Sequence, residues 1–201
     1  MNPDDVHEQW ATRAGEFSPT YYAHQGPNRA SERVYAALDR VVGAEASVLE
    51  LGCNVGRHLA YLHDHGYTDL HGIELNPEAF EVMAEQFPAL AAAGTFHETT
   101  IESVVPEFDD DAFDAVFSVQ TLQHVHPDES WVFDDVARVA ADVLVTVENE
   151  GDHTDREVNY VDDSFPLYYR DWHEVFTSRG LVETHNEQID RDTLRVFEPA
   201  A

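Results

Sequence analysis

The chain has 201 residues, 43% of them hydrophobic, which favours one domain with a buried core over a disordered chain. Its 40 acidic residues outnumber 11 basic residues, all arginine, and the formal charge of −29 argues against binding to nucleic acid phosphates. No apolar run approaches the roughly 20 residues of a membrane span, the acidic N-terminus predicts no secretory signal, and the single cysteine excludes an internal disulfide framework.

The first 45 residues are predicted to form a helical cap or lid on a larger domain. We expect a short helix at residues 4–14 and then a loop, because prolines and glycine interrupt the aromatic stretch that follows. From residue 30 to residue 42, apolar side chains recur at the spacing of one helix face. These side chains are Val34, Leu38, Val41 and Val42.

Strands and helices alternate through the middle of the chain. The predicted strands are 47–51, 70–75, 95–99, 113–119 and 143–147. Helices are expected at 56–65, after Asn76-Pro77-Glu78, and at 128–140, since each has an apolar face or an N-terminal signal. Strands joined by helical crossovers imply a parallel, doubly wound sheet.

The last third of the chain changes character. A helix within 167–179 is expected to bury Trp172, and residues 181–188 and 193–197 follow as two strands joined by a turn. The polar stretch 149–165 predicts a loop over the functional site. Residues 46–201 are therefore expected to form one α/β domain. Its sheet would be Rossmann-like, doubly wound and seven-stranded, mostly parallel with a C-terminal antiparallel hairpin.

The segment Val48 to Leu59 carries the strongest functional signal. It predicts a buried strand, a tight turn with Gly52 and Gly56, and the start of a helix. Such a turn lets a ligand approach the backbone and directs helix N-terminal amides toward it. Glu74, at the end of the next strand, can accept both hydroxyls of a ribose. A glycine turn alone can serve packing, but the combination indicates an enzyme with a nucleoside-containing cofactor.

At these residues the chain resembles the class I S-adenosylmethionine-dependent methyltransferases. Residues 50–56 are similar to the family motif E-x-G-x-G-x-G, with Asn54 in place of the middle glycine, and Asn tolerates left-handed backbone angles. Residues 113–124 resemble the fourth-strand motif F-D-x-V-x-x-x-x-x-L-x-H. The acidic, lysine-free composition resembles that of halophilic archaeal proteins. It implies a salt-adapted cytoplasmic protein, because salt screens charge repulsion.

The resemblance implies S-adenosylmethionine as the cofactor and assigns its contacts. The glycine loop would pass along the methionine and ribose, Glu50 would fix the loop and the amino group, and Glu74 would bind the ribose. Ile101 and Glu102 would flank the adenine. The full predicted set is Glu50, Gly52, Cys53, Asn54, Gly56, Glu74, Leu75, Thr100, Ile101, Glu102, Val119 and Gln120.

Catalysis of methyl transfer needs mainly positioning, but a hydroxyl or amine acceptor also needs a base. The catalytic candidates are His124 and Tyr22, although His124 is equally explained as a buried, hydrogen-bonded histidine. The predicted substrate contacts are Tyr21, His24, Tyr169 and Arg170. The chain leaves little room for a recognition domain, so we expect a small-molecule acceptor, with neither nucleic acid nor membrane as a partner.

No metal site is predicted. The pairs His63-x-His65 and His124-x-His126 lack a third ligand at metal-binding spacing. Twelve histidines in one chain also make chance pairs common.

Two other functions stay open. A nicotinamide-dependent oxidoreductase uses the same layout, but its G-x-G-x-x-G fingerprint is missing because the turn has only Gly52 and Gly56. A non-catalytic partner subunit of methyltransferase fold is the other alternative, and it would need neither the loop nor Glu74. The sequence leaves the methylated atom and the oligomeric state open.

Overall fold

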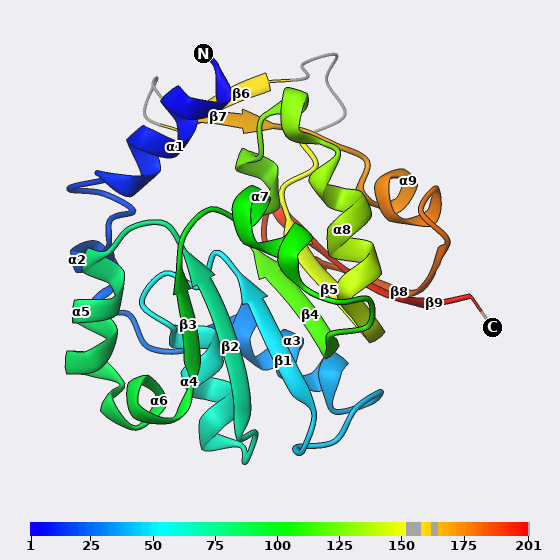
Figure 1. The fold of residues 1–201 in the computed structure, drawn as a ribbon, viewed down its shortest axis with the longest axis horizontal. Helices are drawn as coiled ribbons and strands as arrows, with labels where there is room; N and C mark the ends of the chain where they lie inside the picture. The colour runs from blue at the N-terminus through cyan, green and yellow to red at the C-terminus, as the bar shows by residue number, and fades with distance from the viewer. Residues whose placement is uncertain (152–157, 162–164, 201) are drawn as a thin grey trace.

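The computed structural model describes residues 1–151, 158–161 and 165–200. A seven-stranded sheet forms its centre, in the order β3-β2-β1-β4-β5-β9-β8 (Figure 1). The strands are β1 (Ser47–Leu51), β2 (Asp69–Glu74), β3 (Thr95–Glu98), β4 (Phe113–Val119), β5 (Ala140–Glu148), β8 (Leu181–Ile189) and β9 (Asp192–Pro199). Strands β1 to β5 are parallel, and β9 and β8 continue the sheet antiparallel to their neighbours. The predicted Rossmann-like fold with its terminal hairpin is confirmed.

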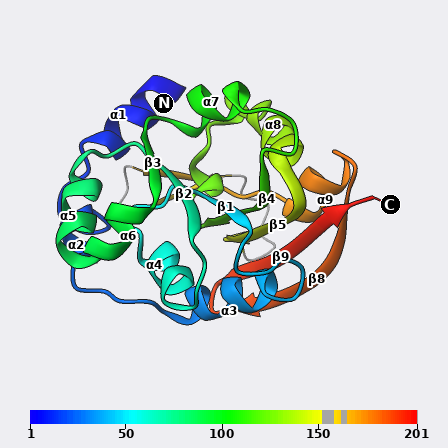
Figure 2. The ribbon, with the colours of Figure 1, turned by 60° about the horizontal axis from the view of Figure 1, so that its bottom comes forward.

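Helices cover both faces of this sheet (Figure 2). One face packs against α3 (Arg29–Leu38), α4 (Arg57–Asp64), α5 (Glu78–Gln86) and α6 (Pro88–Ala93). The other packs against α7 (Ile101–Val104), η1 (Val105–Glu107), α8 (Val132–Val139) and α9 (Trp172–Thr177). Because β1, β4 and β5 are covered on both faces, their sequences are almost continuously apolar. Among the described residues, no helix combines the length and apolarity needed to span a membrane.

Two prolines determine helix boundaries. The helix expected after Asn76 ends at Gln86, because the backbone of Phe87 (φ −129°, ψ 59°) is not helical, and a separate helix, α6, starts at Pro88. Proline excludes the helical conformation from the residue before it, which explains the break. Residues 127–129 form the separate 3-10 turn η3 (Pro127–Glu129), so α8 starts later than predicted.

A cap lies over the C-terminal ends of the parallel strands. It consists of α1 (Pro3–Ala11), α2 (Pro19–Tyr22) and a second, two-stranded sheet of β6 (Val158–Val161) and β7 (Phe165–Tyr168). In Figure 1, α1 and this small sheet lie along the top. The loop predicted at 149–165 therefore contains a strand, β6, while residues 152–157 and 162–164 lie outside the described residues. Within the predicted 1–45 segment, α3 packs on the sheet instead, with Val34 and Leu38 in the core.

A buried carboxylate at the end of β5 fixes the loop that follows β4. Glu148 is fully buried, and it accepts the Ser118 hydroxyl at 2.6 Å. It also accepts the amides of Thr121, Leu122 and Gln123 at 3.1–3.2 Å. Burial raises the pKa of Glu148 to about 7, and these donors oppose that shift. The carboxylate thereby holds η2 (Leu122–His124) at the edge of the sheet.

Replacing Glu148 by Leu should lower the free energy of unfolding by about 3–5 kcal/mol. The substitution leaves a hydroxyl and three amides buried without an acceptor, and each such group costs about 1–3 kcal/mol before relaxation. Urea denaturation in high salt measures the change. The exposed Asp142 on the same strand supplies the control, and Asp142→Leu should stay within about 0.5 kcal/mol of the unsubstituted protein. Equal losses in both variants would contradict the assigned role of Glu148.

Candidate functional site

A cavity of about 560 Å³ lies where β1, β2 and β4 end, beneath the cap. This is the edge at which α/β sheets of this kind bind ligands. Most of the residues predicted from the sequence line it. They are Tyr22, Gly52, Cys53, Asn54, Glu74, Leu75, Thr100, Ile101, Glu102, Val119, Gln120, His124 and Tyr169.

The loop after β1 turns through three left-handed residues. Gly52, Asn54 and Gly56 have φ angles of +70°, +47° and +76°, so Asn54 adopts the conformation expected of it. A Cβ atom on Gly52 would lie 2.3 Å from the Thr121 side chain, and one on Gly56 would lie 2.9 Å from Met83. Both positions therefore need glycine for conformation and for space. Gly56 itself does not line the cavity, because it packs against the helices.

The carboxylate of Glu74 joins the end of β2 to this loop. Its Oε2 atom accepts the amide of Asn54 at 2.9 Å, and its Oε1 atom accepts the amides of Leu75 and Asn76, each at 2.7 Å. Burial raises the pKa of Glu74, and the three amides oppose that shift. A carboxylate offers about four acceptor positions, so Glu74 can still accept a hydrogen bond from a ligand in the cavity.

Glu50, near the end of β1, and Cys53, in the loop after it, are each 1% exposed. Glu50 lies outside the cavity lining, and its Oε2 atom has no hydrogen-bond partner among the described residues. Burial raises its pKa well above the usual value, while the charge of Arg57 and the amide of Leu59 lower it. Burial also raises the pKa of the Cys53 thiol, so this thiol stays protonated near neutral pH.

His124, on η2, meets the cap. Its Nδ1 atom lies 2.9 Å from the carbonyl oxygen of Pro166. A carbonyl only accepts, so Nδ1 carries the proton, and the lone pair of Nε2 accepts from the side-chain amide of Gln123 at 3.3 Å. The imidazole ring lies 4.7 Å from the ring of Trp10 on α1. Burial lowers the pKa of His124 to about 4, and the imidazole is therefore neutral at physiological pH.

Some predicted substrate residues lie away from the cavity. Tyr21 is 41% exposed, His24 is exposed as well, and neither lines the cavity. Arg170 is also outside the lining, since its guanidinium donates to the carbonyl of Val125 at 2.6 Å and lies over the ring of Phe133. Arg170 thus stabilises the segment after η2 from outside the cavity.

The cavity also contains charged residues that the sequence analysis did not select. Arg13, Arg57 and Arg191 line it around Tyr22, and the Cζ atom of Arg57 lies 4.9 Å from the centre of the Tyr22 ring. Burial raises the pKa of Tyr22, and the positive charges of all three arginines oppose this. Arg57 directly follows Gly56 in the glycine-loop segment, and this position was a sequence signal by which it could have been selected as a site residue.

Asp192, at the start of β9, is another residue that sequence reasoning missed. Gln120 has a left-handed backbone (φ +54°), and the Nε2 atom of its side-chain amide donates to Asp192 Oδ2 at 2.6 Å. The second oxygen, Oδ1, is buried without a hydrogen-bond partner among the described residues. Since Asp192 lines the cavity, this oxygen suits a hydrogen-bond donor on a ligand. From sequence, Asp192 belongs to an acidic turn, which carries no functional signal.

The helix α1 contributes Val6, His7 and Trp10 to the same wall, and Arg13 follows just after its end. Trp10 is four residues after Val6 and three after His7, so the three side chains share one helix face. That spacing was visible in the sequence, but nothing in it indicates that the face covers a cavity.

Comparisons with known proteins agree with this arrangement. Residues 48–142 match a family model described as a methyltransferase domain. Methyltransferase GfsG from Streptomyces halstedii is 25% identical over 139 residues, which are 69% of this chain and 48% of GfsG. The match thus spans about half the length of that curated relative.

Two solved structures show the same fold over nearly their whole length. A Haloferax volcanii complex of the Trm112 methyltransferase activator with a putative methyltransferase matches with a TM-score of 0.69 and 17% identity, covering 100% of this chain and 99% of that one. Geranyl diphosphate C-methyltransferase from Streptomyces coelicolor, solved with Mg²⁺, geranyl diphosphate and S-adenosyl-L-homocysteine, matches with a TM-score of 0.71 and 11% identity, covering 98% and 97%. Residues 48–142, a little under half of the chain, thus match the model of a methyltransferase domain, and the fold and the position of the cavity agree with that match.

Proposed function

We propose that the protein is an S-adenosylmethionine-dependent methyltransferase that acts on a small molecule. The observation that carries this proposal is the link from Glu74 to the amide of Asn54, at 2.9 Å, in the wall of the cavity. This hydrogen bond holds a carboxylate beside a loop with left-handed residues, an arrangement that suits a ribose and the methionine part of the cofactor attached to that ribose. A structural neighbour solved with S-adenosyl-L-homocysteine supports the choice of cofactor.

The residues present fit this cofactor in charge and in hydrogen bonding. Glu74 would accept a ribose hydroxyl at its remaining acceptor position, and Ile101, beside Thr100 and Glu102, would cover the adenine. The buried, unpartnered Oδ1 of Asp192 would suit the ammonium group of the methionine part. When bound, S-adenosylmethionine supplies a methyl group on a sulfonium, activated for in-line displacement.

The cap would exclude water from the reacting atoms. The rings of Trp10 and Tyr22 lie in the cavity wall, so α1 and α2 act as the lid in our proposal. The Nε2 lone pair of His124 could take a proton from the acceptor once the acceptor displaces the Gln123 side-chain amide from it. A pKa of about 4 makes this imidazole a weak base, so the proposed role fits an acceptor that loses its proton readily. Positioning would supply most of the catalysis.

Three arginines around one cavity are a large share of the cations in a chain with 11 basic residues. Arg13, Arg57 and Arg191 would attract a carboxylate or a phosphate, from the cofactor's methionine part or from the acceptor. The net charge of −29 repels nucleic acids, which favours a small acceptor. The same charge, with a structural neighbour from Haloferax volcanii, supports a salt-adapted cytoplasmic protein.

Replacing Glu74 by Gln should weaken binding of S-adenosylmethionine by about 10- to 100-fold, because charge-assisted hydrogen bonds contribute about 1.5–3 kcal/mol. Isothermal titration calorimetry in high salt, with S-adenosylmethionine and its demethylated product, measures the change. Glu98 ends the neighbouring strand in register with Glu74 but is exposed and outside the cavity lining. Glu98→Gln is therefore the matched control, and its affinity should not change.

Three results would count against this proposal. They are unchanged affinity in Glu74→Gln, equal losses in Glu74→Gln and Glu98→Gln, and binding of NAD with no binding of S-adenosylmethionine. Tight cofactor binding without methyl transfer to any small acceptor would instead favour a non-catalytic partner subunit.

Acid should destabilise the protein partly through His124. Its folded-state pKa of about 4 lies below the unfolded value of 6.5, so between these pH values only the unfolded chain takes up the proton. Stability therefore falls as the pH drops from 6.5 to 4, by up to about 3 kcal/mol from this residue. Urea denaturation across this range should give a steeper pH dependence for the unsubstituted protein than for His124→Phe. Parallel curves for the two proteins would refute a neutral, buried His124.

A further inference from the structure

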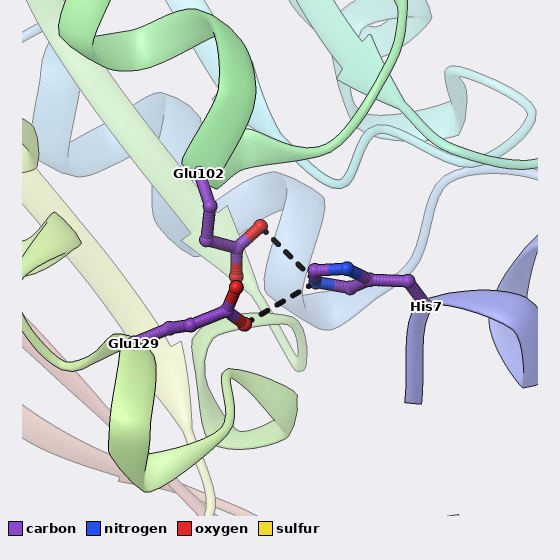
Figure 3. Close-up of side chains that lie close together, drawn as sticks. All are labelled: His7, Glu102 and Glu129. Carbon is purple, nitrogen blue, oxygen red and sulfur yellow. Dashed lines mark ion pairs between the residues drawn. The ribbon is translucent and has the colours of Figure 1, made fainter. Parts of the chain in front are cut away.

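Three side chains from separate elements meet at the rim of the cavity. His7 comes from α1, Glu102 from α7 and Glu129 from η3 (Figure 3). The Nε2 atom of His7 lies 3.4 Å from Oε2 of Glu102 and 3.4 Å from Oε2 of Glu129. One ligand atom from each residue lies within 4.8 Å of the other two. Two carboxylates and one imidazole therefore converge on a single point.

Hydrogen bonding does not account for this convergence. A protonated Nε2 has one hydrogen and cannot donate fully to two oxygens at once. Oε2 of Glu129 is buried and has no hydrogen-bond partner among the described residues. The side chain of Glu102 is also only 9% exposed, so water does little to solvate the group. The contact with His7 Nε2 at 3.4 Å does not give this oxygen a hydrogen bond, a buried carboxylate oxygen without one is costly, and the arrangement points to a missing cation.

The charges lead to the same conclusion. The Glu102 and Glu129 carboxylates both face the single His7 imidazole. Asp4, on the same helix as His7, adds another negative charge nearby. In the described part of the chain, no arginine forms an ion pair with Glu102 or Glu129. The histidine therefore faces an excess of negative charge that a divalent ion would neutralise.

The spacing also suits metal ligands. Two ligand atoms that are each about 2.1 Å from a metal ion, at the tetrahedral angle, lie about 3.4 Å apart. Both distances from the His7 Nε2 atom have this value. A set of one imidazole and two carboxylates is typical of sites for Zn²⁺ and related divalent transition metals.

We propose that His7, Glu102 and Glu129 bind a divalent transition-metal ion at the rim of the cavity. The ion would tie α1 to α7 and η3, and a fourth position would remain for water or for a ligand in the cavity, because His7 and Glu102 both line it. This differs from the sequence analysis, which predicts no metal. The three ligands are distant in sequence, so no spacing motif could indicate them. The proposal does not depend on methyl transfer.

Zn²⁺ binding tests the proposal directly. The full chain, freed of metal with a chelator, is dialysed against Zn²⁺ buffered at low free concentration, and bound zinc is measured by elemental mass spectrometry. We expect one tightly bound equivalent. His7→Gln and Glu129→Gln should each lower the zinc affinity by at least about 100-fold. Mutation of residues that only hydrogen-bond to metal ligands already lowers metal affinity by about 10- to 100-fold, and loss of a ligand itself should cost at least as much. Co²⁺ bound in place of zinc should give a visible spectrum that either substitution abolishes.

Glu8→Gln is the matched control for Glu129→Gln, because Glu8 is an exposed acid of α1 next to His7. It removes the same charge and should keep the tight equivalent. The unsubstituted chain and the three variants share the other acids and histidines, so weak zinc binding at those residues is common to all four proteins. Circular dichroism verifies that each protein is folded. Absence of a tight equivalent in the unsubstituted chain, or its retention in both ligand variants, would overturn the proposal.

Discussion

The geometry of the cavity depends on buried carboxylates that gather backbone amides at the edge of the sheet. Glu74 accepts three amides and holds the loop after β1 against the end of β2, although that loop contains three left-handed residues. Glu148 does the same for the loop after β4. Left-handed and irregular backbone is costly unless its surroundings fix it. The strand side of the cavity is therefore built from main-chain hydrogen bonds, whereas the cap side is built from side-chain contacts such as Trp10 on His124.

Much of the fold could be predicted because the physics involved is local. Strands β1 and β4 were predicted at their observed bounds, since a strand covered on both faces is a continuous apolar run between turns. The hairpin of β8 and β9 follows from two strand-like stretches around a turn that contains Asp190 and Asp192. The position of the cavity follows from the rule that parallel strands end at one edge. Residues of the loop and of strand ends, such as Gly52 and Glu74, could therefore be selected from the sequence.

The remaining features arise from contacts between distant segments, which no local pattern encodes. The spacing of Val6 and Trp10 marks a helix face, yet only the packing of α1 shows that this face covers the cavity. Asp192 lies in an acidic turn in a chain with 40 acids, so its unpartnered oxygen could not be distinguished in advance. Arg170 illustrates the converse, because an arginine in an aromatic cluster suggests substrate binding but here donates to backbone carbonyls.

The single cysteine gives this site a built-in reporter. Cys53 follows the first left-handed glycine of the loop, and its sulfur is enclosed between that loop and Gly72 of β2. An alkylating reagent can reach this thiol only when the loop separates from the neighbouring strand, so the rate of modification measures how often that separation occurs. Any molecule that seals the loop against β2 will slow the labelling, and because the chain has no second thiol the signal comes from this one position.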